Sequence, residues 1–132
     1  MPQSTFRGVL VPALTPFKQD LNPNTSAFLT HCRWLLQQGA DGLAIFGTTS
    51  EGNSLSVEER VNLLETLVEG NIPPAMLMPS TGTCALTETV RLTKYAVSKG
   101  CAGVLMLPPF YYKAVDDDAL FASYSEVIQQ VG

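Results

Sequence analysis

The sequence has few charged residues and contains no long apolar run. Only 15% of its 132 residues are charged, and the net charge is −4, with the basic residues scattered singly. This balance argues against a nucleic acid or an anionic membrane as a partner. The longest apolar runs fall far short of the roughly 20 residues that span a bilayer. Residues 1–5 also lack a basic segment followed by an apolar one, so we expect no secretory signal.

Residues that form disulfides or bind metals are also scarce. The three cysteines, Cys32, Cys84 and Cys101, are an odd number without CxxC spacing. This usage favours reduced thiols and predicts a cytoplasmic protein. His31 is the only histidine, so a zinc site would lack ligands. We therefore expect neither a metal nor a cofactor.

What the sequence does contain is a repeated order of strand, loop, helix and glycine. Helices are expected to end at Gly39, Gly100 and Gly132. Strand-like runs follow the first two of these glycines, at 42–46 and 103–107. No run follows Gly132, although a parallel βα array usually closes with eight units. We therefore expect residues 1–132 to be one domain whose βα pattern stops before such an array would close.

Periodicity and end signals predict four strands and four helices. The run 42–46 is continuously apolar, as is typical of a strand covered on both faces. Ser56 and Glu59 fit a capping box, and Asp116–Asp118 suit the positive end of a helix dipole. The predicted strands are 8–15, 42–46, 75–78 and 104–107. The first predicted helix opens at 22–25 and runs to about 38, the second follows its cap at Ser56 and closes at Gly70, the third covers about 87–98, and the fourth starts at 116–118 and ends at Gly132.

Strand starts recur about every 30 residues, which is the size of one βα unit. Right-handed crossovers then give a parallel sheet. Two architectures fit this order: half of a (β/α)8 TIM barrel, or a small doubly wound sheet. In both, ligands bind at the carboxyl ends of the strands. This rule selects the loops 15–16, 47–51, 79–83 and 108–113.

The most informative of these loops is Gly47-Thr48-Thr49-Ser50-Glu51. Its glycine permits a sharp exit from the strand, and its hydroxyl and N–H groups form a nest for a carboxylate or phosphate. The alternative is an ordinary polar turn. The loop lacks the Gly-Lys-Ser/Thr ending of a P-loop and is not a Gly-x-Ser-x-Gly elbow. Tyr111, expected at the same end of the fold, could exchange protons with Thr48.

Taken together, these loops resemble the dihydrodipicolinate synthase / N-acetylneuraminate lyase family. The resemblance covers nearly the whole chain and keeps the family's order and spacing. The motifs that carry it are Gly8-Val9 and Thr15-Pro16-Phe17, Gly39-Ala40-Asp41-Gly42, Gly47-Thr48-Thr49-Ser50-Glu51, Gly82-Thr83, and Pro108-Pro109-Phe110-Tyr111-Tyr112.

The resemblance implies a (β/α)8 class I aldolase or lyase that acts on pyruvate or a longer 2-keto acid. In this family a lysine forms a Schiff base with the keto group, which acidifies the adjacent carbon. By resemblance, Thr48 is the proton-relay threonine and Thr49 holds the substrate carboxylate. Tyr111 would reach into the site of a neighbouring subunit, which implies a homo-oligomer.

Two features depart from the family pattern. Ser50 replaces the usual glycine, and its hydroxyl would add a substrate-binding donor. The family's Schiff-base lysine, on the sixth strand, would lie beyond Gly132. None of the four lysines, Lys18, Lys94, Lys99 and Lys113, matches its position. We therefore expect the chain to be inactive alone. The alternatives are a non-catalytic module that binds small carboxylates and an assembly fragment.

Overall fold

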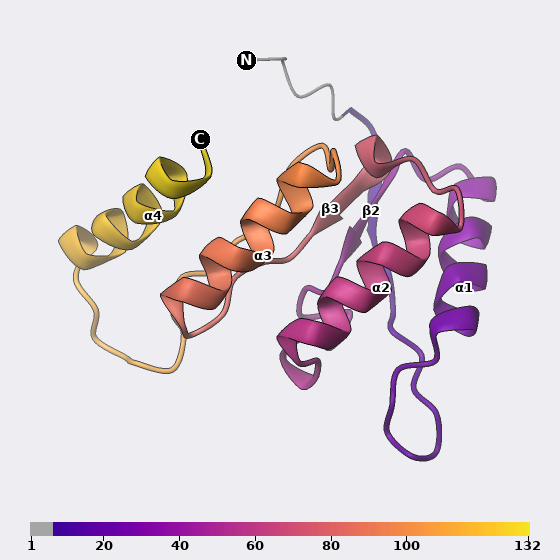
Figure 1. The fold of residues 1–132 in the computed structure, drawn as a ribbon, viewed down its shortest axis with the longest axis horizontal. Helices are drawn as coiled ribbons and strands as arrows, with labels where there is room; N and C mark the ends of the chain where they lie inside the picture. Colours follow the sequence, from indigo (N-terminus) through magenta and orange to yellow (C-terminus); the bar gives the residue numbers. More distant parts are fainter. Residues whose placement is uncertain (1–6) are drawn as a thin grey trace.

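The computed structural model of the chain describes residues 7–132. Within them, three parallel strands lie in the order β1-β2-β3 and alternate with helices along the chain (Figure 1). The strands are β1 (Leu10–Pro12), β2 (Gly42–Ile45) and β3 (Leu77–Pro79). The helices are α1 (Thr25–Gln37), α2 (Val57–Glu69), α3 (Leu86–Ser98) and α4 (Asp117–Val131), with short 3₁₀ turns η1 (Gly52–Ser54) and η2 (Pro74–Met76).

The helices form one row, which distinguishes between the two predicted architectures. α1 contacts α2, α2 contacts α3, and α3 contacts α4, and Figure 1 shows the four helices in that order beside the sheet. The strand order does not reverse along the sheet. A doubly wound sheet needs such a reversal and helices on both faces. The arrangement is therefore that of consecutive barrel units.

The predicted fourth strand, 104–107, is reduced to a single parallel bridge between Ser80 and Leu105. The Thr81 N–H donates to the Leu105 carbonyl at 2.8 Å, and the Leu105 N–H donates to the Pro79 carbonyl at 3.0 Å. Pro108 and Pro109 follow, and neither has an N–H group to extend the ladder. This segment pairs on one side only, so the expectation of a regular strand here was wrong.

The first and third predicted strands are shorter than expected. The first was expected over 8–15, and its ladder covers Leu10–Pro12, with one further bond from the Ala13 N–H to the Ala44 carbonyl at 3.0 Å. The third was expected from Ala75, but residues 74–76 form the 3₁₀ turn η2. Proline pre-sets the backbone for a helical turn at its first position, so Pro74 delays the strand to Leu77.

The helix starts confirm the predicted end signals. The Ser56 hydroxyl accepts from the Glu59 N–H at 3.1 Å, and the Glu59 carboxylate accepts from the Ser56 N–H at 2.7 Å. This reciprocal pair is the predicted capping box. Asp116 caps α4 by accepting from the Ala119 N–H at 2.8 Å. Such caps contribute about 1 kcal/mol each, and they set where the helices leave the loops.

The hydrophobic core lies between the sheet and the inner faces of α1 and α2. All four residues of β2 are buried, as the continuous apolar run predicted. The helices add side chains that fill the space above the strand. The largest buried side chains are Phe28, Cys32, Leu43, Ile45, Leu63, Leu67 and Leu77.

In the described part of the chain, no helix is long and apolar enough to cross a membrane. Residues 7–132 also contain no group of three His, Cys, Asp or Glu side chains placed to hold a metal.

The burial of the thiols predicts their order of alkylation. Burial raises the pKa of Cys32 to about 12 and that of Cys101 to about 11, whereas Cys84 is exposed. Because the thiolate is the reactive form, iodoacetamide at pH 8 should modify Cys84 first. Peptide mass spectrometry would locate the adducts, with urea-unfolded protein as the control in which all three react. Alkylation of native Cys32 as fast as Cys84 would contradict the buried position.

Candidate functional site

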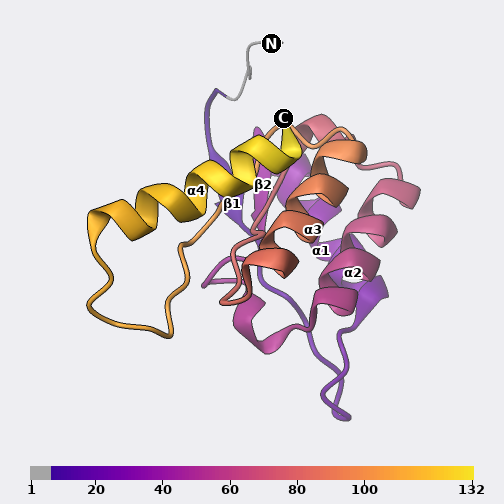
Figure 2. The same ribbon diagram turned by 60° about the vertical axis from the view of Figure 1, so that its left-hand side comes forward.

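The loops that follow β1, β2 and β3 and the loop before α4 lie at the same end of the fold, the lower end in Figure 1. Figures 1 and 2 both show the segment between Leu107 and α4 as a wide loop clear of α1 and α2. This is the end to which the carboxyl ends of the parallel strands point. The structure therefore brings the four predicted loops to one end.

The loop Gly47–Glu51 is a tight turn held by its own backbone. The Gly52 N–H donates to the Gly47 carbonyl at 3.0 Å, and the Glu51 N–H donates to the Thr48 carbonyl at 3.1 Å. Phe46, directly before the loop, and Glu51, its last residue, have positive φ of 63° and 56°. A Cβ on Gly52 would lie 1.8 Å from the Phe46 carbonyl oxygen. The turn therefore requires glycine at 52.

Ser50 is buried and donates its hydroxyl hydrogen to the Ala13 carbonyl. Ala13 directly follows β1, so this bond ties the loop after β2 to the end of the neighbouring strand. A hydroxyl has a single proton to donate. The Ser50 side chain is therefore engaged within the protein, and its hydrogen is not free for a substrate oxygen.

Arg60 ties the same loop to the loop after β3. It is only 5% exposed, and its Nε and Nη2 donate to the Gly52 carbonyl at 3.1 and 2.6 Å. Its Nη1 makes a longer contact of 3.4 Å to the Gly82 carbonyl. Burial lowers the pKa of this guanidinium from its ordinary value, yet arginine stays charged in proteins. The buried positive charge of Arg60 is therefore stabilised by the backbone carbonyls of Gly52 and Gly82.

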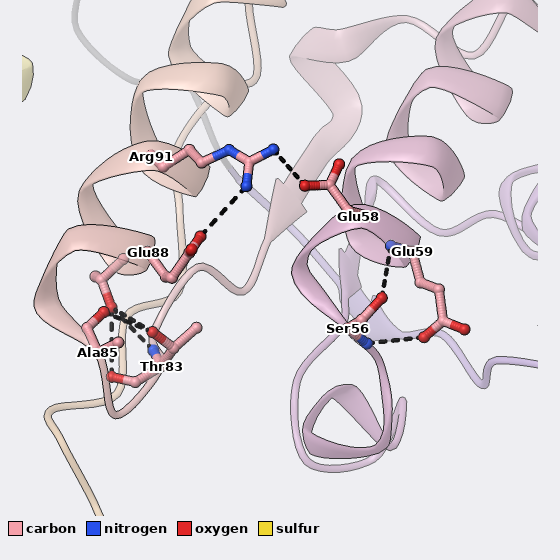
Figure 3. A network of polar contacts seen from close by, with 8 residues as sticks. Ser56, Glu58, Glu59, Thr83, Ala85, Glu88 and Arg91 are labelled. Atoms are coloured by element: carbon pink, nitrogen blue, oxygen red, sulfur yellow. Dashed lines mark hydrogen bonds and ion pairs between the residues drawn. The ribbon is translucent and has the colours of Figure 1, made fainter.

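The loop after β3 is fixed by two threonines and one glycine. The Thr83 N–H donates to the Thr89 hydroxyl at 3.0 Å, and the Thr83 hydroxyl donates to the Ala85 carbonyl at 2.8 Å, at the start of α3 (Figure 3). A Cβ on Gly82 would lie 2.5 Å from backbone atoms of Leu107. The loop can approach that segment so closely only because residue 82 is glycine.

A pocket of about 210 Å³ opens between these loops. Its lining is polar where the loops after β2 and β3 meet and apolar on the segment that pairs with β3. The lining residues are Gly47, Thr48, Ser80, Leu105, Met106 and Leu107.

The predicted site residues occupy different places around this pocket. Thr48 lines it. Thr49 is exposed on the same loop and is not among the lining residues. Tyr111 is 75% exposed on the wide loop and contacts Tyr112 edge to face at 5.5 Å between ring centres. The pairing of Thr48 with Tyr111 therefore stays a prediction.

With this geometry in place, the sequence comparisons identify the family. The model of the dihydrodipicolinate synthetase family matches residues 5–132. The chain belongs to this family. An uncharacterised DapA-like lyase of Chloroflexus aurantiacus is 35% identical over 89% of this chain and 40% of its own length. A 4-hydroxy-tetrahydrodipicolinate synthase of Desulforamulus reducens is 33% identical over 82% of this chain and 36% of its own.

Solved structures of the dihydrodipicolinate synthetase family show the same fold. A dihydrodipicolinate synthase of Agrobacterium tumefaciens superposes with a TM-score of 0.90 at 33% identity, over 96% of this chain and 44% of that one. YagE of E. coli K12, solved in complex with pyruvate, gives 0.85 at 25% identity over 96% and 42%. The predicted fold class is thus confirmed: these residues form the first units of a TIM-barrel aldolase fold. The chain spans about 40% of the length of its curated relatives.

Sequence reasoning missed two residues of this site, Arg60 and Ser80. Arg60 occupies the buried stripe of α2 together with Leu63, Leu64 and Leu67. A charge on the apolar face of a predicted helix was the available signal, because such a charge needs buried acceptors. Ser80 gave a weaker signal, since nothing local distinguishes it from the other hydroxyls in its loop.

Arg60→Met should lower the free energy of unfolding by about 2 kcal/mol, because the buried Gly52 carbonyl would lose both hydrogen bonds. Arg60→Lys should recover only part of this loss, because a single ammonium group does not match the fork of the guanidinium. Urea unfolding measures both effects.

The matched control for Arg60 is Arg91→Met. Arg91 pairs with Glu58 at 2.5 Å between α3 and α2 (Figure 3), but both side chains are at least half exposed. Exposed pairs contribute at most about 1 kcal/mol. Equal losses from Arg60→Met and Arg91→Met would show that Arg60 does not hold the loops together.

Proposed function

We propose that this chain supplies the 2-keto-acid-binding part of a class I aldolase or lyase site, with pyruvate or a similar acid as substrate. The observation that carries the proposal is the pocket beside Thr48 at the carboxyl ends of the strands, in a chain of the dihydrodipicolinate synthetase family. The pyruvate complex of the relative YagE supports this substrate class.

The two threonines take the roles of proton relay and carboxylate ligand. Thr48 and Thr49 are both exposed on the loop after β2, so their hydroxyls are accessible to a bound acid. Thr48 passes a proton to or from the reacting substrate, and Thr49 donates to the carboxylate. Ser50 serves substrate binding through its bond to Ala13, which holds the threonines in place.

Tyr111 acts across a subunit contact in a homo-oligomer. Its side chain is three-quarters exposed and lies outside the pocket of its own chain. A large exposed aromatic side chain on a loop is suited to an interface. The exposure thus supports a role for Tyr111 in the site of a neighbouring subunit.

The Schiff-base amine comes from outside these 132 residues. No lysine lines the pocket. Lys99 donates to Glu65 at 2.9 Å, which raises the pKa of its amine, and a raised pKa disfavours the neutral nucleophile. Lys113 donates to the Phe110 carbonyl at 3.1 Å on the exposed loop. By itself the chain, as the N-terminal half of one barrel domain, therefore binds the keto acid without imine chemistry.

Borohydride trapping tests this proposal. The 132-residue chain, incubated with pyruvate and then reduced, should keep its mass of 14.2 kDa, because imine formation needs a neutral amine at the keto carbon. Pyruvate should still raise the melting temperature, since a ligand that binds only the folded state stabilises it. Thr49→Val should remove this rise, and the exposed control Thr87→Val on α3 should keep it.

Each contrary result points to a different reading. A reduced adduct on a lysine of this chain would contradict the inference that the Schiff-base amine comes from outside these 132 residues. A chain that ignores pyruvate but changes its oligomer size on Tyr111→Ala would favour the assembly fragment. Pyruvate binding by the chain, without turnover when the rest of a barrel is supplied, would favour the non-catalytic carboxylate-binding module.

A further inference from the structure

Ser80 is a buried polar residue that the assigned site roles leave unused. It directly follows β3 and is 5% exposed. Its N–H donates to the Ile45 carbonyl at 2.7 Å, and it forms the bridge to Leu105 on the other side. Its backbone is therefore held between two neighbouring segments, and its side chain leaves from a defined point.

The next residue shows which way the Ser80 side chain points. The Thr81 hydroxyl lies 2.9 Å from the Thr93 hydroxyl on α3, so Thr81 faces the helix layer. Successive side chains of an extended backbone point to opposite faces. Ser80 therefore faces the inner side of the sheet, where it lines the pocket with Gly47 and Thr48.

Of two cavities that Ser80 lines within residues 7–132, the pocket beside Thr48 has room for a ligand. The residue also borders the packed space under α2 and α3, but that space measures about 10 Å³, enough for at most one water. The pocket beside Thr48 measures about 210 Å³.

The buried hydroxyls of Ser50, Thr81 and Thr93 are engaged in hydrogen bonds within the protein. In the described residues, the buried side-chain oxygens that lack a partner are those of Thr15, Glu88 and Tyr95, and Ser80 is not one of them. Because Ser80 lines the pocket beside Thr48, its hydroxyl is open to a molecule bound there.

The two walls of the pocket indicate the chemistry of that molecule. Thr48 and Ser80 present hydroxyls on one side, and Leu105 and Leu107 present hydrocarbon on the other. A short 2-keto acid has oxygens at one end and a methyl or methylene group at the other. We propose that Ser80 is a further substrate-binding residue, whose hydroxyl donates a hydrogen bond to an oxygen of the keto acid. This inference rests on the proposed function.

Calorimetric titration of the protein with pyruvate tests the assignment. Ser80→Ala removes only the hydroxyl and should weaken pyruvate binding roughly tenfold, as expected for one lost hydrogen bond to a charged ligand. Its melting temperature without ligand should stay unchanged, because the substitution removes one hydroxyl that faces the pocket. The control is Ser98→Ala, an exposed serine at the far end of α3, which should bind as tightly as the parent.

If Ser80→Ala does not fold, Ser80→Cys replaces it in the titration. This variant nearly keeps the shape of the side chain but donates only a weak hydrogen bond, so it should also bind pyruvate more weakly than the parent. Parent-like binding by the folded Ser80 variant would overturn the role of Ser80 alone. A parent protein that does not bind pyruvate would overturn the proposed function and this inference with it. A weakened Ser80 variant beside an unchanged Ser98→Ala would support the assignment.

Discussion

The site depends on the pairing of β2 with a parallel neighbour on each side. β2 is hydrogen-bonded to β1 and β3 in register, with Leu43 opposite both Val11 and Leu77. Because all three strands run the same way, their carboxyl ends arrive at one edge. Burial of β2 on both faces is typical of a strand in a parallel sheet. In an antiparallel pair, the loops after the two strands would lie at opposite ends of the sheet. Without this pairing, Thr48 and Ser80, 32 positions apart, would not share a pocket.

Hydrogen bonds between the loops then hold the pocket in shape. Ser50 joins the loop after β2 to the end of β1, and Arg60 joins it to the loop after β3. Gly52 and Gly82 permit the close backbone approaches on which these contacts depend. A serine hydroxyl and an arginine are thus used for support, while Thr48 and Ser80 line the pocket itself. Rigid support of this kind is what a binding site needs to keep its donors in place.

The segment 102–107 is the boundary of the described sheet. It pairs with β3 through one bridge, and Leu105, Leu107 and Phe110 remain partly exposed. Relatives of the dihydrodipicolinate synthetase family are more than twice as long as this chain. An array of consecutive βα units buries its inner face only on closure. The apolar wall of the pocket, formed by Leu105, Met106 and Leu107, therefore lies on the segment with the least regular pairing to the sheet.

By itself the sequence determined the helices, the buried central strand, the parallel order and the loops that carry the site. These features follow from local periodicity, from caps such as Ser56 with Glu59, and from crossover handedness, all of which neighbours in the chain specify. It also contained the motifs that identify the family. Only the tertiary structure decided that the segment 104–107 is a bridge, that Ser50 supports the loop, and that Arg60 and Ser80 belong to the site. The physical reason is that these roles depend on distant partners, Ala13, Gly82 and Thr48, whose positions no local pattern encodes.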